Sequence, residues 1–183
     1  MMIETIGFVE FSSIAKGIEA ADAILKTADT RLVFARETCP GKYNILFCGE
    51  VAAVTSSVEA ARELCGHYVV DSVVIPRLAP EVIPAINQTA PPREVDALGV
   101  MEFYDITQAV YAADAAVKAA EVYLLNVRLA AGIGGKSFVV LSGDVAAVKT
   151  AVDAGTRRAR EAGVLVAETV IPNPRPEVFE TLL

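Results

Sequence analysis

The chain has 183 residues with a net charge of −7, and 54% of its residues are hydrophobic. Its Lys and Arg residues form no block, which argues against nucleic-acid binding because that needs clustered positive charge. The longest stretch without an ionisable residue, Val82–Pro92, contains three prolines, so we expect no membrane-spanning segment.

Residue patterns predict the same six elements in each half, in the same order, and one further short helix at the end of the first half. A strand leads into an Ala-rich helix, followed by two strands around a turn, a second helix and a final strand. In the first half we expect Thr5–Phe11, Ile14 to about Ala28, Leu32–Arg36, Asn44–Cys48, a helix from Gly49-Glu50 to Leu64, Val69–Ile75, and a short terminal helix over Ala79–Ile86. In the second half we expect Ala97–Phe103, Thr107–Ala120, Val122–Leu129, Phe138–Leu141, Val145–Ala162 and Val164–Ile171. This order is the ferredoxin-like β-α-β-β-α-β pattern, an α+β fold that hosts many unrelated functions.

The two halves are copies of one sequence. Residues 7–11 (GFVEF) return as 99–103 (GVMEF), an offset of 99 − 7 = 92, and 20–23 (AADA) return at the same offset. After short insertions, 49–54 (GEVAAV) return as 143–148 (GDVAAV), and 80–82 (PEV) return as 176–178. A duplication of this length predicts two tandem domains, 1–90 and 96–183, joined by a linker at 91–95.

The repeated segments resemble the bacterial microcompartment shell domain. The resemblance rests on Gly7–Phe11, Ala20–Lys26, Gly49–Val54 and Ile75-Pro76, and on the second copies Ala112–Lys118, Gly143–Val148 and Ile171-Pro172. Two fused, unpermuted copies are similar to the tandem-domain shell proteins, above all to the iron–sulfur type of propanediol-utilisation microcompartments.

The resemblance implies a homotrimer shaped as a pseudohexamer with a central pore, which tiles edge to edge with other shell proteins. It implies a structural role in the shell of a cytoplasmic compartment, with encapsulated redox enzymes as further partners. Three cysteines without a pairing pattern are typical of the same reducing environment.

The halves differ most in the loop between their second and third strands, which the resemblance places at the pore. The first half has Thr38-Cys39-Pro40-Gly41-Lys42, and the second has Gly132-Ile133-Gly134-Gly135 before Lys136. Cys39 therefore has no counterpart. Pro40 stiffens its loop, and Gly41 allows a tight turn.

One thiol cannot hold an iron–sulfur cluster, but three thiols gathered by a three-fold axis can, since such clusters take thiolate ligands, usually four. The resemblance implies that Cys39 is the metal ligand and that three chains share a 4Fe-4S cluster for electron transfer across the shell. The residues alone leave open an inert Cys39 lining a metabolite pore. A regulatory module that binds a small ligand is a further alternative.

The Gly132–Ser137 segment resembles a phosphate loop only imperfectly. Ala130 stands where a Walker pattern needs Gly, and Ser137 stands where a dinucleotide fingerprint needs Gly or Ala. Close approach of backbones is the simpler interpretation.

Basic residues at matching positions suggest assembly edges. Lys26 and Lys118 lie late in the first helix of each half, and the resemblance implies that they contact neighbouring plates; a solvated lysine near a helix C-terminus is the plainer alternative. Arg77 follows Ile-Pro at another edge position, where the second half has Asn173, so we expect the two edges to differ.

The remaining ionisable and thiol side chains suggest no catalytic site, and we expect no enzyme. Cys48 and Cys65 lie in apolar segments that predict core positions. His67, the only histidine, follows Gly66 at a helix end, where a surface position is expected. Two matched carboxylate pairs, Glu10 with Glu102 and Asp22 with Asp114, predict structural hydrogen bonds, because duplication puts the members of each pair in separate domains.

Overall fold

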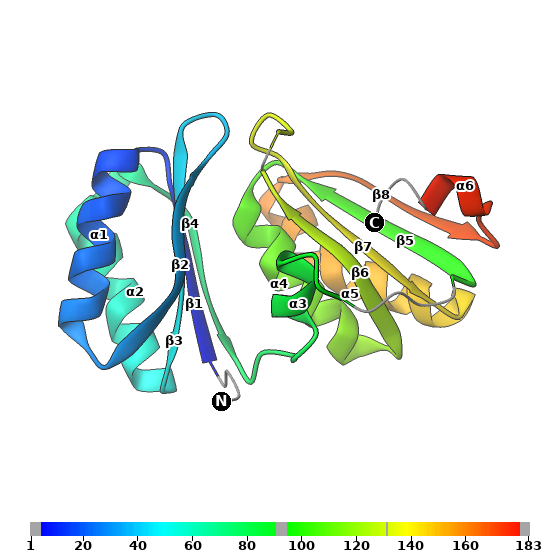
Figure 1. Cartoon of the computed structure of the whole chain (residues 1–183), viewed down its shortest axis with the longest axis horizontal. Helices are drawn as coiled ribbons and strands as arrows, with labels where there is room; N and C mark the ends of the chain where they lie inside the picture. The colour runs from blue at the N-terminus through cyan, green and yellow to red at the C-terminus, as the bar shows by residue number, and fades with distance from the viewer. Residues whose placement is uncertain (1–4, 91–94, 131, 180–183) are drawn as a thin grey trace. The chain divides into compact units, whose positions relative to one another are not determined.

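The structure, a computed structural model, describes residues 5–90, 95–130 and 132–179 (Figure 1). Contacts divide it into two units. The first unit ends at Leu78, and Ala79 begins the second; loop residues 132–135 group with the first unit. None of the helices in the described ranges is both long enough and apolar enough to cross a membrane.

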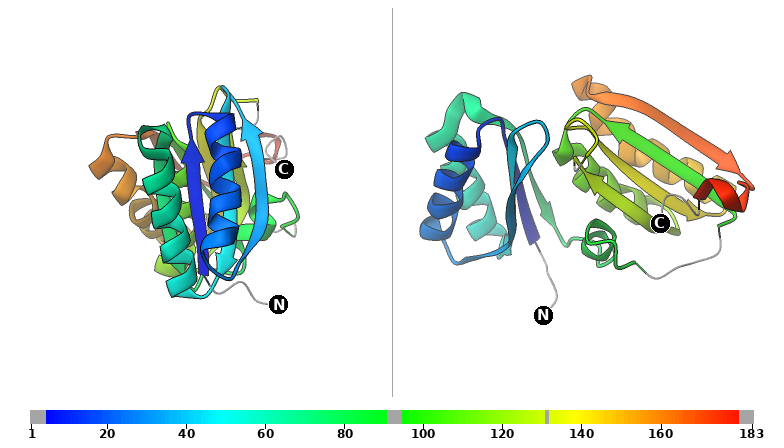
Figure 2. Two further views of the ribbon diagram at one scale, coloured as in Figure 1. Left: turned by 90° about the vertical axis from the view of Figure 1, so that its left-hand side faces the viewer. Right: turned by 45° about the horizontal axis from the view of Figure 1, so that its top comes forward.

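The first unit is a four-stranded antiparallel sheet with two helices on one face (Figure 2). The strands lie in the order β2-β3-β1-β4. The elements are β1 (Thr5–Phe11), α1 (Ile14–Thr27), β2 (Thr30–Thr38), β3 (Lys42–Gly49), α2 (Val51–Cys65), the 3-10 turn η1 (Gly66–Tyr68) and β4 (Val69–Pro76).

The second unit repeats this arrangement, with strand order β6-β7-β5-β8. Its elements are α3 (Val82–Ile86), β5 (Ala97–Phe103), α4 (Ile106–Ala119), β6 (Val122–Leu129), β7 (Ser137–Gly143), α5 (Val145–Ala162), β8 (Leu165–Pro172) and α6 (Pro176–Phe179). The predicted fold class, two tandem β-α-β-β-α-β domains, is confirmed.

Local chemistry explains where the helices begin and end. The Ser13 hydroxyl accepts a hydrogen bond from the Lys16 N–H, and the Asp105 carboxylate accepts one from the Gln108 N–H at 2.9 Å, which caps α1 and α4. Gly163 ends α5 in a left-handed conformation with φ 71°.

A repeated glycine sets how closely the helices and strands pack. A Cβ added at Gly7 would lie 2.4 Å from Phe47 Cζ, and one at Gly99 would lie 2.7 Å from Leu141 Cδ1. Only glycine leaves room for these core side chains. The core of the first unit includes Phe11, Ile24, Ile45, Phe47 and Val54, all fully buried.

Three of the strands that flank the candidate loops, β2, β3 and β7, run further than the sequence predicts, whereas β6 has its predicted bounds. β2 begins at Thr30 and ends at Thr38 because its ladder with β3 continues to the pair Thr38↔Lys42. Both β2 and β6 shift register at the same point, between Leu32 and Phe34 and between Leu124 and Asn126.

The tail of the first repeat groups with the second unit. The sequence places residues 79–86 in a first domain ending at residue 90, but their contacts lie in the second unit, where α3 packs on β6. Of the predicted linker 91–95, residues 91–94 lie outside the described residues.

Candidate functional site

The turn between β2 and β3 presents Cys39 to solvent. The Gly41 N–H donates to the Thr38 carbonyl at 2.9 Å, and the Cys39–Pro40 peptide bond is cis, as in type VI turns. Gly41 has φ 99°, a conformation that favours glycine. Cys39 is exposed and unbonded to another cysteine, so its thiol is open to a ligand or partner.

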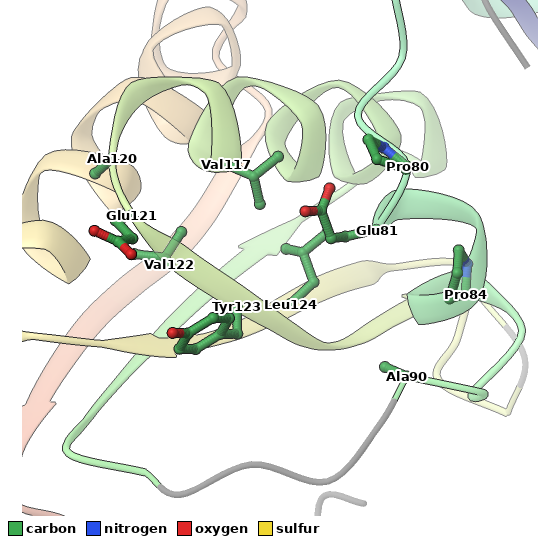
Figure 3. Close-up of a pocket in the computed structure, with 10 residues that line it drawn as sticks. All are labelled: Pro80, Glu81, Pro84, Ala90, Val117, Ala120, Glu121, Val122, Tyr123 and Leu124. Carbon is green, nitrogen blue, oxygen red and sulfur yellow. The ribbon is translucent and has the colours of Figure 1, made fainter. Parts of the chain in front are cut away.

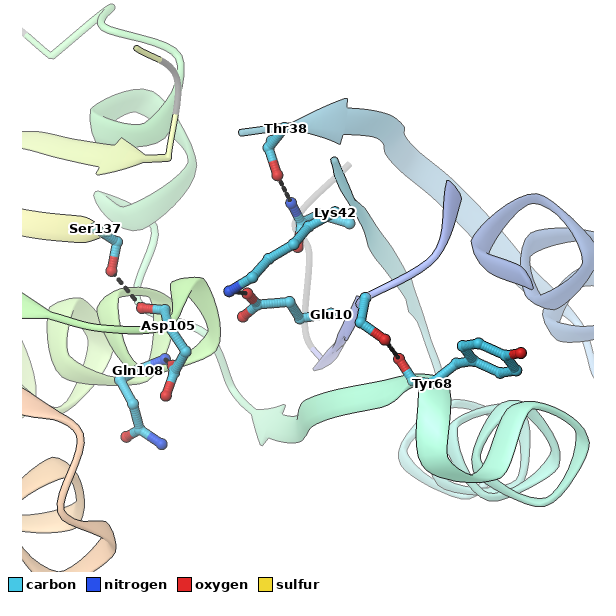
Figure 4. A network of polar contacts seen from close by, with 9 residues as sticks. Glu10, Thr38, Lys42, Tyr68, Asp105, Gln108 and Ser137 are labelled. Atoms are coloured by element: carbon cyan, nitrogen blue, oxygen red, sulfur yellow. Dashed lines mark hydrogen bonds and ion pairs between the residues drawn. The ribbon is translucent and has the colours of Figure 1, made fainter. Parts of the chain in front are cut away.

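A salt bridge fixes the base of this turn. Lys42 Nζ lies 2.7 Å from Glu10 Oε1, which joins the start of β3 to β1 (Figure 4). Glu10 is 0% exposed, and Lys42 is mostly buried. The Asn44 side-chain amide donates to Thr38 Oγ1 at 2.6 Å and secures the last residue of β2.

The second half keeps this salt bridge but changes the loop. Lys136 Nζ lies 2.7 Å from Glu102 Oε1, but here Glu102 is 34% exposed. The hydrogen bond from Lys136 to Glu102 raises the pKa of Lys136 above that of an ordinary lysine. The predicted structural roles of Glu10 and Glu102 are confirmed.

Glycines allow the second loop to turn without side-chain strain. Gly132, Gly134 and Gly135 all have positive φ angles, between 67° and 85°. Gly135 lies against the first turn: a Cβ there would be 2.6 Å from Pro40 Cδ and 3.0 Å from the Cys39 carbonyl oxygen. The structure therefore brings part of the Gly-rich segment beside the cysteine turn.

The phosphate-loop interpretation does not fit this loop. The segment leads into strand β7, which begins at Ser137, whereas a phosphate loop opens a helix. Ile133 is half-buried, and Ala131 lies outside the described residues.

The other two thiols belong to the core, as the sequence predicts. Cys48 and Cys65 are buried. The Cys65 thiol donates to the Lys16 carbonyl at 3.4 Å, and burial raises the pKa of Cys65. His67 is exposed in η1, which confirms its expected surface position, and its ring contacts that of Tyr68 at a tilt of 37°.

The part of one chain that the structure describes contains no group of three or more His, Cys, Asp or Glu side chains suited to a metal ion. A cluster ligated by Cys39 therefore requires thiols from several chains. A free, exposed cysteine fits an iron–sulfur cluster, whose ligands are cysteine sulfurs, on that condition alone.

The candidate edge lysines both form ion pairs within their own helix. Lys26 Nζ lies 2.6 Å from Asp22 Oδ2, and Lys118 Nζ lies 2.6 Å from Asp114 Oδ2. The predicted structural hydrogen bonds of the two aspartates are confirmed. Arg77 is exposed with φ 50°, and Asn173 at the matching position has φ 48°.

Asp114 also holds a contact that the sequence analysis missed. Its Oδ1 accepts a hydrogen bond from the Ala79 N–H at 2.8 Å. No signal in the sequence marks this contact, because Asp22 and Asp114 match and have nearly the same neighbours in the chain.

A cavity of about 510 Å³ lies in the second unit where α3 faces the end of α4 and the start of β6 (Figure 3). Its lining combines apolar residues with two carboxylates: Pro80, Glu81, Pro84, Ala90, Val117, Ala120, Glu121, Val122, Tyr123 and Leu124. The cavity lies between the tail of the first repeat and the edge of this unit formed by α4 and β6.

Comparisons with known proteins match the whole chain. The BMC domain family matches residues 5–78 and again residues 97–174. The chain is 39% identical over 182 residues to the bacterial microcompartment shell protein PduT of Citrobacter freundii, covering 100% of this chain and 99% of that protein. Shell protein PduA of the same organism is 42% identical over 88 residues, 48% of this chain and 91% of PduA.

A solved structure has the same fold over nearly its full length. The crystal structure of a microcompartment protein from Desulfitobacterium hafniense superposes with a TM-score of 0.85 at 47% identity, covering 98% of this chain and 99% of that chain. With both halves matched and two full-length similarities above 30% identity, the chain belongs to the BMC-domain family as a tandem-domain shell protein of bacterial microcompartments.

Proposed function

We propose that three copies of the chain form a pseudohexameric shell plate whose Cys39 turns meet at a central pore and hold one 4Fe-4S cluster. The observation that carries the proposal is the exposed Cys39 at the tip of a braced turn, present in one half and absent from the other. A three-fold axis would gather three such thiols, one from each chain.

The chain's own residues would position the ligand. The Thr38–Gly41 hydrogen bond closes the turn, and the Lys42–Glu10 pair ties its base to the central strand β1. Absence of a side chain at Gly135 leaves room for the Cys39 backbone. When bound, the cluster would supply one-electron transfer between the two sides of the shell.

A metabolite pore without a cluster is the second candidate. It is favoured by the Gly132 and Gly134 backbone, where a Cβ would meet no atom within 4 Å, so the loop leaves space around it. In that case Cys39 would line the opening without binding metal.

The edges of the plate are proposed to contact other shell proteins through Lys26, Arg77 and Lys118. The Lys26 side chain is more exposed than that of Lys118, and Arg77 is a cation where the second half has the neutral Asn173. The two kinds of edge would therefore offer different charge to their neighbours.

Two measurements test the proposal. The mass of the chain in dilute buffer should equal three copies, whereas a two-copy mass would support a ligand-binding regulatory module instead. Iron and sulfide should be present after anaerobic reconstitution of the wild type and of the control Cys65→Ala, and absent from Cys39→Ser. An iron-free wild-type trimer would overturn the cluster and support the metabolite pore.

A further inference from the structure

The tail of the first repeat packs on the second unit. Residues 80–82 match residues 176–178 and so belong to the end of a repeat, yet α3 packs against β6 and α4. Val82 and Ala85 are 0% exposed, and Ile86 is buried. The short segment therefore contributes to the core of a unit built from the other repeat.

One carboxylate anchors the start of this tail. Asp114 on α4 accepts the Ala79 N–H with Oδ1 at 2.8 Å and the Lys118 ammonium with Oδ2 at 2.6 Å. The Asp114 side chain is only 7% exposed. Hydrogen bonds to a charged acceptor are stronger than neutral ones, so this contact fixes where the tail crosses α4.

The matching surface of the first unit, on α1 and β2, is covered by no such tail among the described residues. Asp22 matches Asp114 and forms the same ion pair, with Lys26, but its side chain is 65% exposed. Asp22 Oδ1 accepts no hydrogen bond from the described residues. Leu25, which matches the cavity-lining Val117, is 44% exposed, and Leu32 is half-buried where its match Leu124 is buried.

The second repeat ends in the matching tail. The offset that pairs Pro80 with Pro176 (176 − 80 = 96) also pairs Ala79 with Arg175 and Val82 with Val178. Val178 is 46% exposed, whereas Val82 is 0% exposed. Within the described ranges, α6 makes no packing contact with another element comparable to that of α3 on β6.

We infer that the tail of the second repeat, residues 173–179, docks on the first unit of another copy of this chain. The Arg175 N–H donates to Asp22 of the partner subunit, and Val178 packs beside the partner's Leu25 on α1. The occupant is a second copy because donor and receiver are the sequence matches of a tail and a surface already packed together in the second unit. The Arg175 cation also suits the carboxylate of the partner's Asp22.

This contact rests on the proposed trimer and specifies how its copies would be joined. It joins the end of one chain to the beginning of the next, so it is heterologous, and three such contacts can close a ring. This docking of residues 173–179 on the next copy, here called tail exchange, should therefore help to hold the copies together.

Engineered disulfides test the contact in a Cys39→Ser background. Asp22→Cys combined with Arg175→Cys should, on mild oxidation, give covalent two-chain and three-chain species on a non-reducing gel. Mixing the two single variants should give two-chain species only. The mismatched pair Asp153→Cys with Arg175→Cys should give none, because Asp153 is exposed on α5 outside the proposed contact.

A second variant measures the apolar part. Val178→Asp should raise the concentration at which the copies dissociate by about three- to tenfold, the effect of losing partial burial of one valine. Val51→Asp is the matched control, since Val51 is 50% exposed on α2 and should leave dissociation unchanged.

The outcomes separate this inference from the proposed function. A disulfide formed within single chains, or none formed while the mass remains three copies, would overturn the tail exchange and leave the trimer standing. A wild-type mass of one copy would overturn both.

Discussion

Removing the lysine that braces the cysteine turn should destabilise the protein far more than removing its match in the second half. Lys42→Met keeps the side-chain length but leaves Glu10, which is 0% exposed, without its cation. Breaking a buried ion pair from one side costs about 3–5 kcal/mol. Lys42 retains some exposure, so we expect about 3 kcal/mol, the lower end of that range.

The assay is urea unfolding followed by circular dichroism at one fixed chain concentration, because assembly links stability to concentration. A loss of about 3 kcal/mol should move the midpoint down by about 1.5 M urea for a slope near 2 kcal/mol per M. Lys136→Met is the matched control and should shift it little, because Glu102 is 34% exposed and retains contact with water.

A double variant completes the test. Glu10→Gln with Lys42→Met removes both charges and should recover much of the loss, since no buried carboxylate charge then remains without the lysine. Equal midpoint shifts for Lys42→Met and Lys136→Met would refute the reasoning, because the difference in burial would then have no energetic effect.

Three further predictions concern packing, thiol reactivity and alkaline pH. Gly7→Ala should lower stability by about 1–3 kcal/mol through overpacking against Phe47, as measured by urea unfolding, and Phe47→Leu should restore part of it; no loss would mean that the ring moves freely. In the metal-free native protein, a thiol reagent should label Cys39 alone, with Cys48 and Cys65 reacting only after unfolding; fast labelling of a second thiol would contradict their burial. Because Glu102 raises the pKa of Lys136, the stabilisation from this pair should be present at neutral pH and lost as the pH rises through the raised pKa; Lys136→Met should show a smaller alkaline loss than the wild type, and an identical loss would count against the pair.

The sequence predicted the fold because both halves carry regular patterns. Runs of strand-forming residues predicted β1 and β5 with their observed bounds, and the Ala-rich period predicted α1 and α4 to within about two residues. The duplication also showed which elements of the two halves correspond, since each is repeated in the same order. The turn residues Thr38–Lys42 were likewise placed between two strands by their Pro and Gly.

The differences between matched residues could not be predicted from the sequence. Asp22 and Asp114 have nearly the same neighbours in the chain, yet one is largely exposed and the other is buried under the Ala79 segment. The burial of each aspartate depends on whether another segment crosses its helix, and such a crossing is a tertiary contact that local sequence does not specify. Glu10 and Lys42 were identified separately, but their pairing follows from the register of β1 with β3.

The assignment of residues 79–86 shows the same limit. Their sequence marks them as the end of a repeat, while their apolar side chains pack on β6 of the next one. The sequence repeat therefore ends near residue 90, whereas the packed unit ends at Leu78. Only the three-dimensional contacts reveal the boundary at Leu78.

Native mass spectrometry of the anaerobically reconstituted protein tests the central claim most directly. The account predicts one dominant species with the mass of three chains plus a single 4Fe-4S cluster, and three chains without added mass for Cys39→Ser. A wild-type three-chain species that never carries the cluster mass, or a cluster bound to a single chain, would contradict it.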